Sequence, residues 1–100
     1  MAGEAPRHHR PTTYQLLLVA DADPGLLAKV ANALLVSNRL PRVVTMLQHG
    51  EGDVEVAIEL DYTDAETAAR ILRNLWRVIS IRDVSLFGCS ASGFERIDMP

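Results

Sequence analysis

Residues 21–26 hold the side chains best suited to bind a small charged ligand. They read Asp-Ala-Asp-Pro-Gly-Leu and lie between an apolar run and a helical pattern. Backbone N–H groups at a helix start have no partner inside the helix, so those near Gly25 and Leu26 are expected to face an incoming anion. The carboxylate of Asp21 or Asp23 would then bind an amino group of the same ligand. An amino acid carries both groups, although from the residues alone an ordinary capped helix start is the favoured explanation of this segment. The candidate effector-binding residues are Asp21, Ala22, Asp23, Pro24, Gly25 and Leu26.

Side chains for catalysis or metal binding are poorly placed by comparison. The possible nucleophiles are Cys89, Ser37, Ser80 and Ser85. None has a histidine at a spacing typical of an activated nucleophile, because the three histidines fall in a tail or a turn. The chain has one cysteine, which forms neither an internal disulfide nor a set of metal ligands. The sequence therefore predicts no enzyme activity, no metal site and no cofactor.

The composition narrows the class of protein. One hundred residues, 48% of them hydrophobic, make one domain with a real core. The net charge of −3 disfavours a general nucleic-acid binder, which needs a basic face. No apolar run approaches the roughly 20 residues that span a bilayer, and residues 1–13 lack the apolar stretch of a signal peptide. The expected location is the cytoplasm.

The first half of the chain predicts a strand, a helix and a hairpin. Residues 14–20 are a continuous apolar run, typical of a central strand. Asp23 is a suitable cap for the following helix, with Pro24 in its first position and Asn38 as its stop. Residues 42–48 and 54–60 form two strands joined by the glycine-containing turn 49–53. In the strand at residues 54–60, apolar residues alternate with Glu55, Ala57 and Glu59, so one face of this strand packs against the core.

The second half predicts another helix and a fourth strand. Thr63 and Glu66 match a capping box, in which each residue satisfies the other's backbone N–H group. The helix behind it buries Ala68, Ile71, Leu72 and Leu75. Residues 79–87 form the last strand, and residues 88–100 resemble a loose tail. The expected domain covers residues 13–88, between a disordered tail (1–12) and a flexible tail (89–100).

This element order predicts an α+β fold. It is the ferredoxin-like βαββαβ sandwich, a four-stranded antiparallel sheet with both helices on one face and the first strand in the centre. Three functions that occur on this fold are disfavoured, because the chain lacks the residues that each of them needs. The open face of the third strand carries glutamates instead of the aromatic residues of an RNA-recognition module. The loop before the first helix has neither the paired cysteines of a copper chaperone nor the basic residues of an acylphosphatase-like enzyme.

Two segments resemble a known family. Leu-Leu-Leu-Val at residues 16–19, followed by Asp-Pro-Gly-Leu-Leu-Ala-Lys-Val at residues 23–30, resembles the opening of ACT domains. Residues 69–84 are similar to the end of the ACT domain in small subunits of acetohydroxyacid (acetolactate) synthase, and the similarity covers about residues 14–87. The resemblance implies a non-catalytic regulatory subunit in branched-chain amino-acid biosynthesis. Its implied partner is a thiamine-diphosphate-dependent catalytic subunit.

The resemblance also implies a homodimer and an effector. Members that bind amino acids dimerise side by side and hold the effector between the first loop of one protomer and the second strand of the other. This chain has Ala22 where those members have Asp or Asn, and it lacks their glycine and asparagine between the first helix and the second strand. A branched-chain amino acid is therefore expected to bind weakly or not at all. Two alternatives remain: a free-standing ACT-type amino-acid-sensing domain of another metabolic enzyme, and a structural homodimeric interaction domain.

Overall fold

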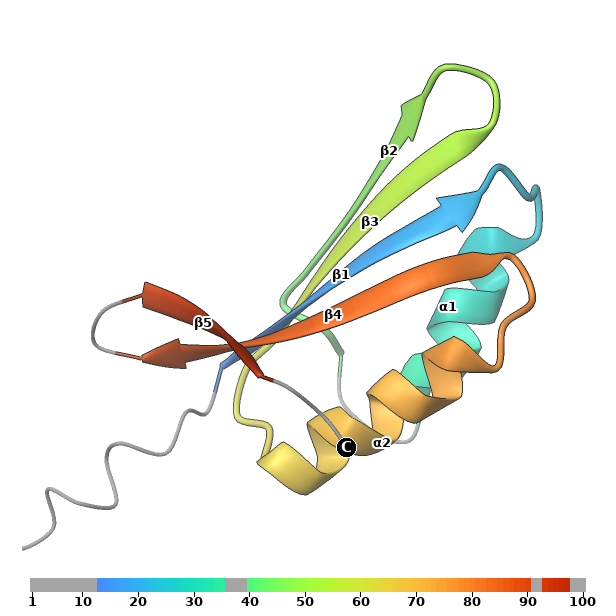
Figure 1. The fold of residues 1–100 in the computed structure, drawn as a ribbon. Coiled ribbons are helices and arrows are strands. Elements are labelled where there is room, and N and C mark those ends of the chain that lie inside the picture. Colours follow the sequence, from blue (N-terminus) through green and yellow to red (C-terminus); the bar gives the residue numbers. More distant parts are fainter. Residues whose placement is uncertain (1–12, 36–39, 91–92, 98–100) are drawn as a thin grey trace, which may run out of the picture.

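The residues that the structure describes fold as one antiparallel sheet with two helices on one of its faces (Figure 1). The computed structural model describes residues 13–35, 40–90 and 93–97. The elements are β1 (Tyr14–Asp21), α1 (Leu26–Leu34), β2 (Val43–His49), β3 (Asp53–Leu60), α2 (Ala65–Trp76), β4 (Ile81–Ser90) and β5 (Gly93–Ile97). The strand order is β2-β3-β1-β4-β5. The predicted tail 1–12 and the predicted helix stop at Asn38 lie outside the described residues.

Strand β1 is central, as predicted, because both of its edges are paired. Leu16 lies opposite Ile58 of β3 on one side and Leu86 of β4 on the other. These three side chains are at most 2% exposed and face the helices. The predicted core residues of α2 are also buried, which confirms the helical pattern. No helix in the described part of the chain is long and apolar enough to cross a lipid bilayer.

The prediction of a four-stranded sheet is wrong, because residues 93–97 of the expected tail form a fifth strand. Strand β5 pairs with the C-terminal half of β4, from Leu86↔Ile97 to Ser90↔Gly93. It covers part of the outer edge of β4, whose backbone groups would otherwise lack partners. Ile97 also packs against the core. The segment Gly-Phe-Glu-Arg-Ile is too short and too charged for its alternation to be recognised.

Both helices begin later than the sequence indicates. Helix α1 is capped at Gly25, so the predicted cap Asp23 and Pro24 lie in the turn before it. Helix α2 is capped by Asp64, whose carboxylate accepts the Thr67 N–H at 2.7 Å. The Thr63 hydroxyl donates instead to the carbonyl of residue 61 at 3.1 Å. At α2 the Asp64 side chain therefore takes the place expected for Thr63. At α1 no side chain caps the first turn, and the Asp23 carboxylate bonds to the N–H of the cap residue Gly25. Strand β4 likewise begins two residues after the predicted position.

The register of β3 is tested by two adjacent substitutions. Ile58 is fully buried, so Ile58→Ala should lower the free energy of unfolding by about 2–5 kcal/mol. Glu59 lies on the other face, so Glu59→Ala should change it by no more than about 0.5 kcal/mol. Urea unfolding of the two variants measures both values. Equal losses would mean that the two residues do not lie on opposite faces.

Candidate functional site

The loop between β1 and α1 is held by two neighbouring loops at the same end of the sheet. The N–H group of Asp21 donates to the carbonyl of Ser80, just before β4, at 2.8 Å. The N–H group of Ala22 donates to the carbonyl of Gly52, in the β2–β3 hairpin, at 3.2 Å. Segments that lie about 30 and 60 positions apart in the sequence therefore position the candidate binding residues.

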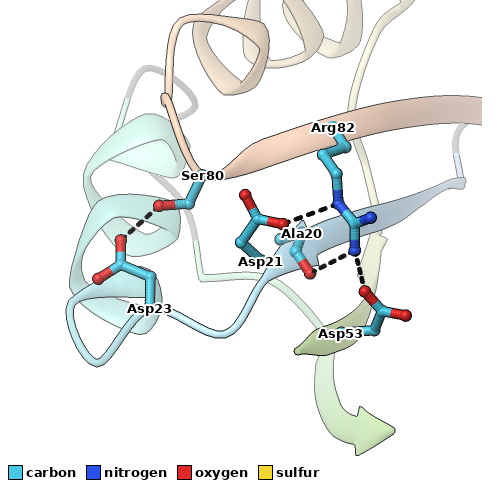
Figure 2. A network of polar contacts seen from close by, with 6 residues as sticks. All are labelled: Ala20, Asp21, Asp23, Asp53, Ser80 and Arg82. Carbon is cyan, nitrogen blue, oxygen red and sulfur yellow. Dashed lines mark hydrogen bonds and ion pairs between the residues drawn. The ribbon is translucent and has the colours of Figure 1, made fainter. Parts of the chain in front are cut away.

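The Asp23 carboxylate is the most heavily bonded side chain of this loop. One oxygen, Oδ2, accepts from the Ser80 hydroxyl at 2.5 Å (Figure 2). The same oxygen accepts from Lys29 Nζ at 2.7 Å. The other, Oδ1, accepts from the Gly25 N–H at 2.9 Å. The bond from Lys29, with those from Ser80 and Gly25, holds the pKa of Asp23 far below its usual range. The carboxylate is therefore ionised across the physiological range.

The N–H groups that the sequence analysis expected to be open to a ligand are already bonded. The Gly25 N–H points to the Asp23 carboxylate, and the Leu26 N–H donates to the Asp23 carbonyl at 2.9 Å. Asp23 thus places the protein's own carboxylate at the helix start, where an anion is favoured. A ligand carboxylate would have to displace it.

Asp21 is also engaged, through an arginine that sequence reasoning missed. Arg82 Nε lies 3.0 Å from Asp21 Oδ1, while its terminal nitrogen bonds to Asp53 and lies 3.4 Å from the Ala20 carbonyl (Figure 2). The bond to Asp53 raises the pKa of Arg82, and the charge of Asp21 adds to this. The cluster joins β1, β3 and β4. The available signal was an arginine at the start of β4, together with an aspartate at the end of β1 and another at the start of β3.

A hollow of about 510 Å³ lies between this loop and strand β2. Its lining residues are Ala22, Asp23, Pro24, Leu26, Met46, Gln48 and Val54. Four of the six candidate residues therefore come together, while Asp21 and Gly25 are not among the lining. The volume lies within the range of small-molecule sites. The β2 and β3 residues could have been found from the alternation of the hairpin, since Gln48 pairs with Val54 on the helix side.

The candidate nucleophiles are dispersed. Ser80 donates to Asp23, Ser85 lies on β4, and Ser37 lies outside the described residues. His49 Nε2 lies 3.0 Å from Glu55 Oε1 across the exposed β2–β3 hairpin. Among the residues that the structure describes, no three His, Cys, Asp or Glu side chains gather as metal ligands.

Comparison with known proteins identifies the fold. No family model matches the sequence, and no curated protein has a significantly similar sequence. Among solved structures, the ligand-free regulatory subunit of aspartate kinase from Thermus thermophilus is similar, with a TM-score of 0.54 and 20% identity. The match covers 81% of this chain and 60% of that one. An ASNC-family transcriptional regulatory protein from Pyrococcus furiosus is more distant, with a TM-score of 0.41, 14% identity and coverage of 81% and 53%. The similarity to the Thermus thermophilus structure supports the ferredoxin-like α+β fold of this chain.

The bonds of Asp23 make part of the folding stability depend on pH. Because its pKa is lower in the folded than in the unfolded chain, Asp23 stabilises the fold above about pH 4. This contribution is lost as the pH falls through the folded pKa. Wild type should therefore exceed Asp23→Asn in stability at pH 7, and the difference should shrink below about pH 4. Urea midpoints across this range provide the measurement.

Asp83→Asn is the matched control, since it removes one negative charge from an exposed site on β4. A stability difference for Asp23→Asn that stays constant from pH 7 to pH 2.5 would contradict the role assigned to its carboxylate.

Proposed function

We propose that this chain is a non-catalytic regulatory module of the ACT type that acts on a partner enzyme. The observation that carries the proposal is the hollow between the β1–α1 loop and strand β2 of the same chain. Binding members of the ACT family use the same two elements, contributed there by two different protomers. The similar structure from Thermus thermophilus is itself a regulatory subunit. The dispersed nucleophiles favour regulation over catalysis.

The proposed partner is the thiamine-diphosphate-dependent catalytic subunit of acetohydroxyacid synthase. Its support is the resemblance of residues 16–30 and 69–84 to the small subunits of that enzyme. A homodimer and a cytoplasmic location belong to the same proposal. The second candidate is a free-standing amino-acid-sensing domain of another enzyme, which is favoured by the similarity to an aspartate kinase subunit.

The partner proposal predicts activation. Added to the purified acetohydroxyacid synthase catalytic subunit of the same organism, the chain should raise its rate of acetolactate formation in a saturable manner. An unrelated βαββαβ domain of similar size is the control. No effect on the rate, together with no co-migration in sedimentation, would contradict this partner and leave the sensing domain as the better candidate.

The loop geometry favours weak binding of an amino acid. The effector's carboxylate would compete with Asp23 for the Gly25 N–H and for Lys29, and its ammonium would compete with Arg82 for Asp21. Each group of the ligand therefore replaces an interaction that the free protein already makes. Ala22 contributes only a methyl group to the hollow, at the position where binding members of the family carry an acid or an amide.

Calorimetry with valine, leucine and isoleucine tests this account. We expect weak or no binding to the wild-type chain. Ala22→Asn adds a donor and an acceptor to the lining of the hollow and should raise the affinity. Ala31→Asn, on the exposed side of α1, is the control and should not. Wild-type binding at micromolar Kd (about −8 kcal/mol) would contradict the competition described above. Absence of binding by both variants would favour a module whose only ligand is a protein.

A further inference from the structure

The face of the sheet opposite the helices carries an exposed apolar surface. Leu17 and Val19 of β1 are 40% and 38% exposed there, and Leu47 of β2 is 53% exposed. All three border a hollow of about 430 Å³. In the described part of the chain, both helices pack on the other face of the sheet (Figure 1). We call this surface the open face.

Strand β1 has the composition of a strand that is covered on both sides. Leu16 and Leu18 point to the helices and are buried, while Leu17 and Val19 point the other way. Apolar runs of this kind are typical of strands buried on both faces, whereas a strand with one wet face alternates with polar residues, as β3 does. An apolar patch that stays exposed marks an interaction site.

The open face is acidic as well as apolar. Glu55 of β3 and Asp83 of β4 line the same hollow as the leucines. Glu55 lies 3.0 Å from His49, which carries a positive charge only when it is protonated. Asp83 is exposed, and no ion pair within the described part of the chain includes it. The hollow therefore has two carboxylates at its border and no permanent cation bound to either of them.

The arginines of the sheet do not neutralise this face. Two of them are each shared by two carboxylates: Arg82 by Asp21 and Asp53, and Arg42 by Glu59 and Asp61. Each of these groups keeps one negative charge that its arginine does not offset. Arg96 of β5 lies opposite Phe87, and it forms no ion pair with an acid among the residues that the structure describes.

The combination of apolar and acidic groups decides what kind of partner fits. Two open faces in contact would bring acids against acids, so a second copy of this chain is disfavoured. A phosphate backbone would be repelled for the same reason. A protein segment that carries apolar side chains beside cations complements both properties of the face.

The spacing of the two acids suits a helix that crosses the strands. Glu55 and Asp83 lie opposite Val19, on the two sides of β1. Neighbouring strands are about 4.8 Å apart, so these acids lie about 10 Å apart across the sheet. Residues i and i+7 of a helix share one face and are separated by about 10.5 Å along the axis. Cations at these two positions match the two acids, and apolar residues at i+3 and i+4 then lie over β1.

We propose that the open face binds a basic amphipathic helix of a partner protein. Two cations of this helix, seven positions apart, pair with Glu55 and Asp83, while its apolar stripe covers Leu17, Val19 and Leu47. The inference goes beyond the proposed function, because it assigns a second surface and the chemistry of the partner segment. It depends neither on which enzyme the chain regulates nor on an effector beside the β1–α1 loop.

Fluorescence anisotropy with the full chain and a labelled peptide tests this surface. The probe is an alanine-based helical peptide of about 18 residues with lysine at its positions 5 and 12. Leucines at its positions 8 and 9 face β1, and those at 1 and 16 reach β2 in either orientation of the helix. The control peptide has glutamate in place of both lysines. We expect saturable binding of the lysine peptide with a Kd below about 1 mM, and binding of the glutamate peptide at least tenfold weaker.

Variants of the chain locate the binding surface. Glu55→Gln and Asp83→Asn each remove one charge and should weaken binding of the lysine peptide about threefold. Leu17→Thr removes apolar contact from a strand position and should weaken it at least as much. Glu66→Gln and Leu27→Thr are the matched controls, because they make the same kinds of change at exposed positions of the helices. Both controls should leave the affinity unchanged.

A charge exchange gives a gain of binding as a further readout. The double variant Glu55→Lys and Asp83→Lys should bind the glutamate peptide more tightly than the lysine peptide, which reverses the preference of the wild type. High salt should weaken binding of the lysine peptide to the wild type, because the ion pairs at the border of the face are exposed to solvent.

Several outcomes would overturn the proposal. They are no saturable binding of the lysine peptide, equal binding of the glutamate peptide, and equal weakening by Glu66→Gln. Sedimentation without peptide adds another, since a wild-type dimer that Leu17→Thr dissociates would show that a second copy occupies the face. Circular dichroism checks that each variant is folded, and the exposed Glu55→Gln and Asp83→Asn decide the matter if Leu17→Thr is not. Failure of enzyme activation leaves these results untouched, so the two proposals are tested separately.

Discussion

Strand β1 has hydrogen-bonding partners along both edges, and the position of every other element depends on this pairing. A strand in the middle of a sheet must match its backbone groups to two neighbours at once, which fixes the registers of β3 and β4. Those registers place Ile58 and Leu86 beside Leu16, under the two helices. The end of β1 then brings three loops together, and the candidate binding residues lie among them.

At that end, the polar groups stabilise one another instead of remaining open for a ligand. The Asp23 carboxylate occupies the start of α1, and Arg82 bridges Asp21 to Asp53. Exposed ion pairs add little stability individually, but here they determine what the loop can still bind. The hollow beside it is lined mostly by apolar or neutral side chains. A loop of this kind is poorly suited to hold a small zwitterion tightly.

The two faces of the sheet differ in what covers them. The helices cover one face with the side chains of the core, while the other keeps leucine and valine in contact with solvent. Acidic residues surround this apolar region. Glu55 and Asp83 border it directly, while Asp21 and Asp53 share a single cation, Arg82.

The sequence determined the order of the elements, the central position of β1 and the buried residues of β3 and α2, because these follow from local periodicity. It also indicated the loop at residues 21–26. Only the tertiary structure decided the helix caps, the fifth strand and the partners of the two loop aspartates. Asp23 lies 57 positions from Ser80, and Asp21 lies 61 positions from Arg82, so no local pattern links them. Strand β5 forms because β4 offers it an edge, and its own residues carry little signal of a strand.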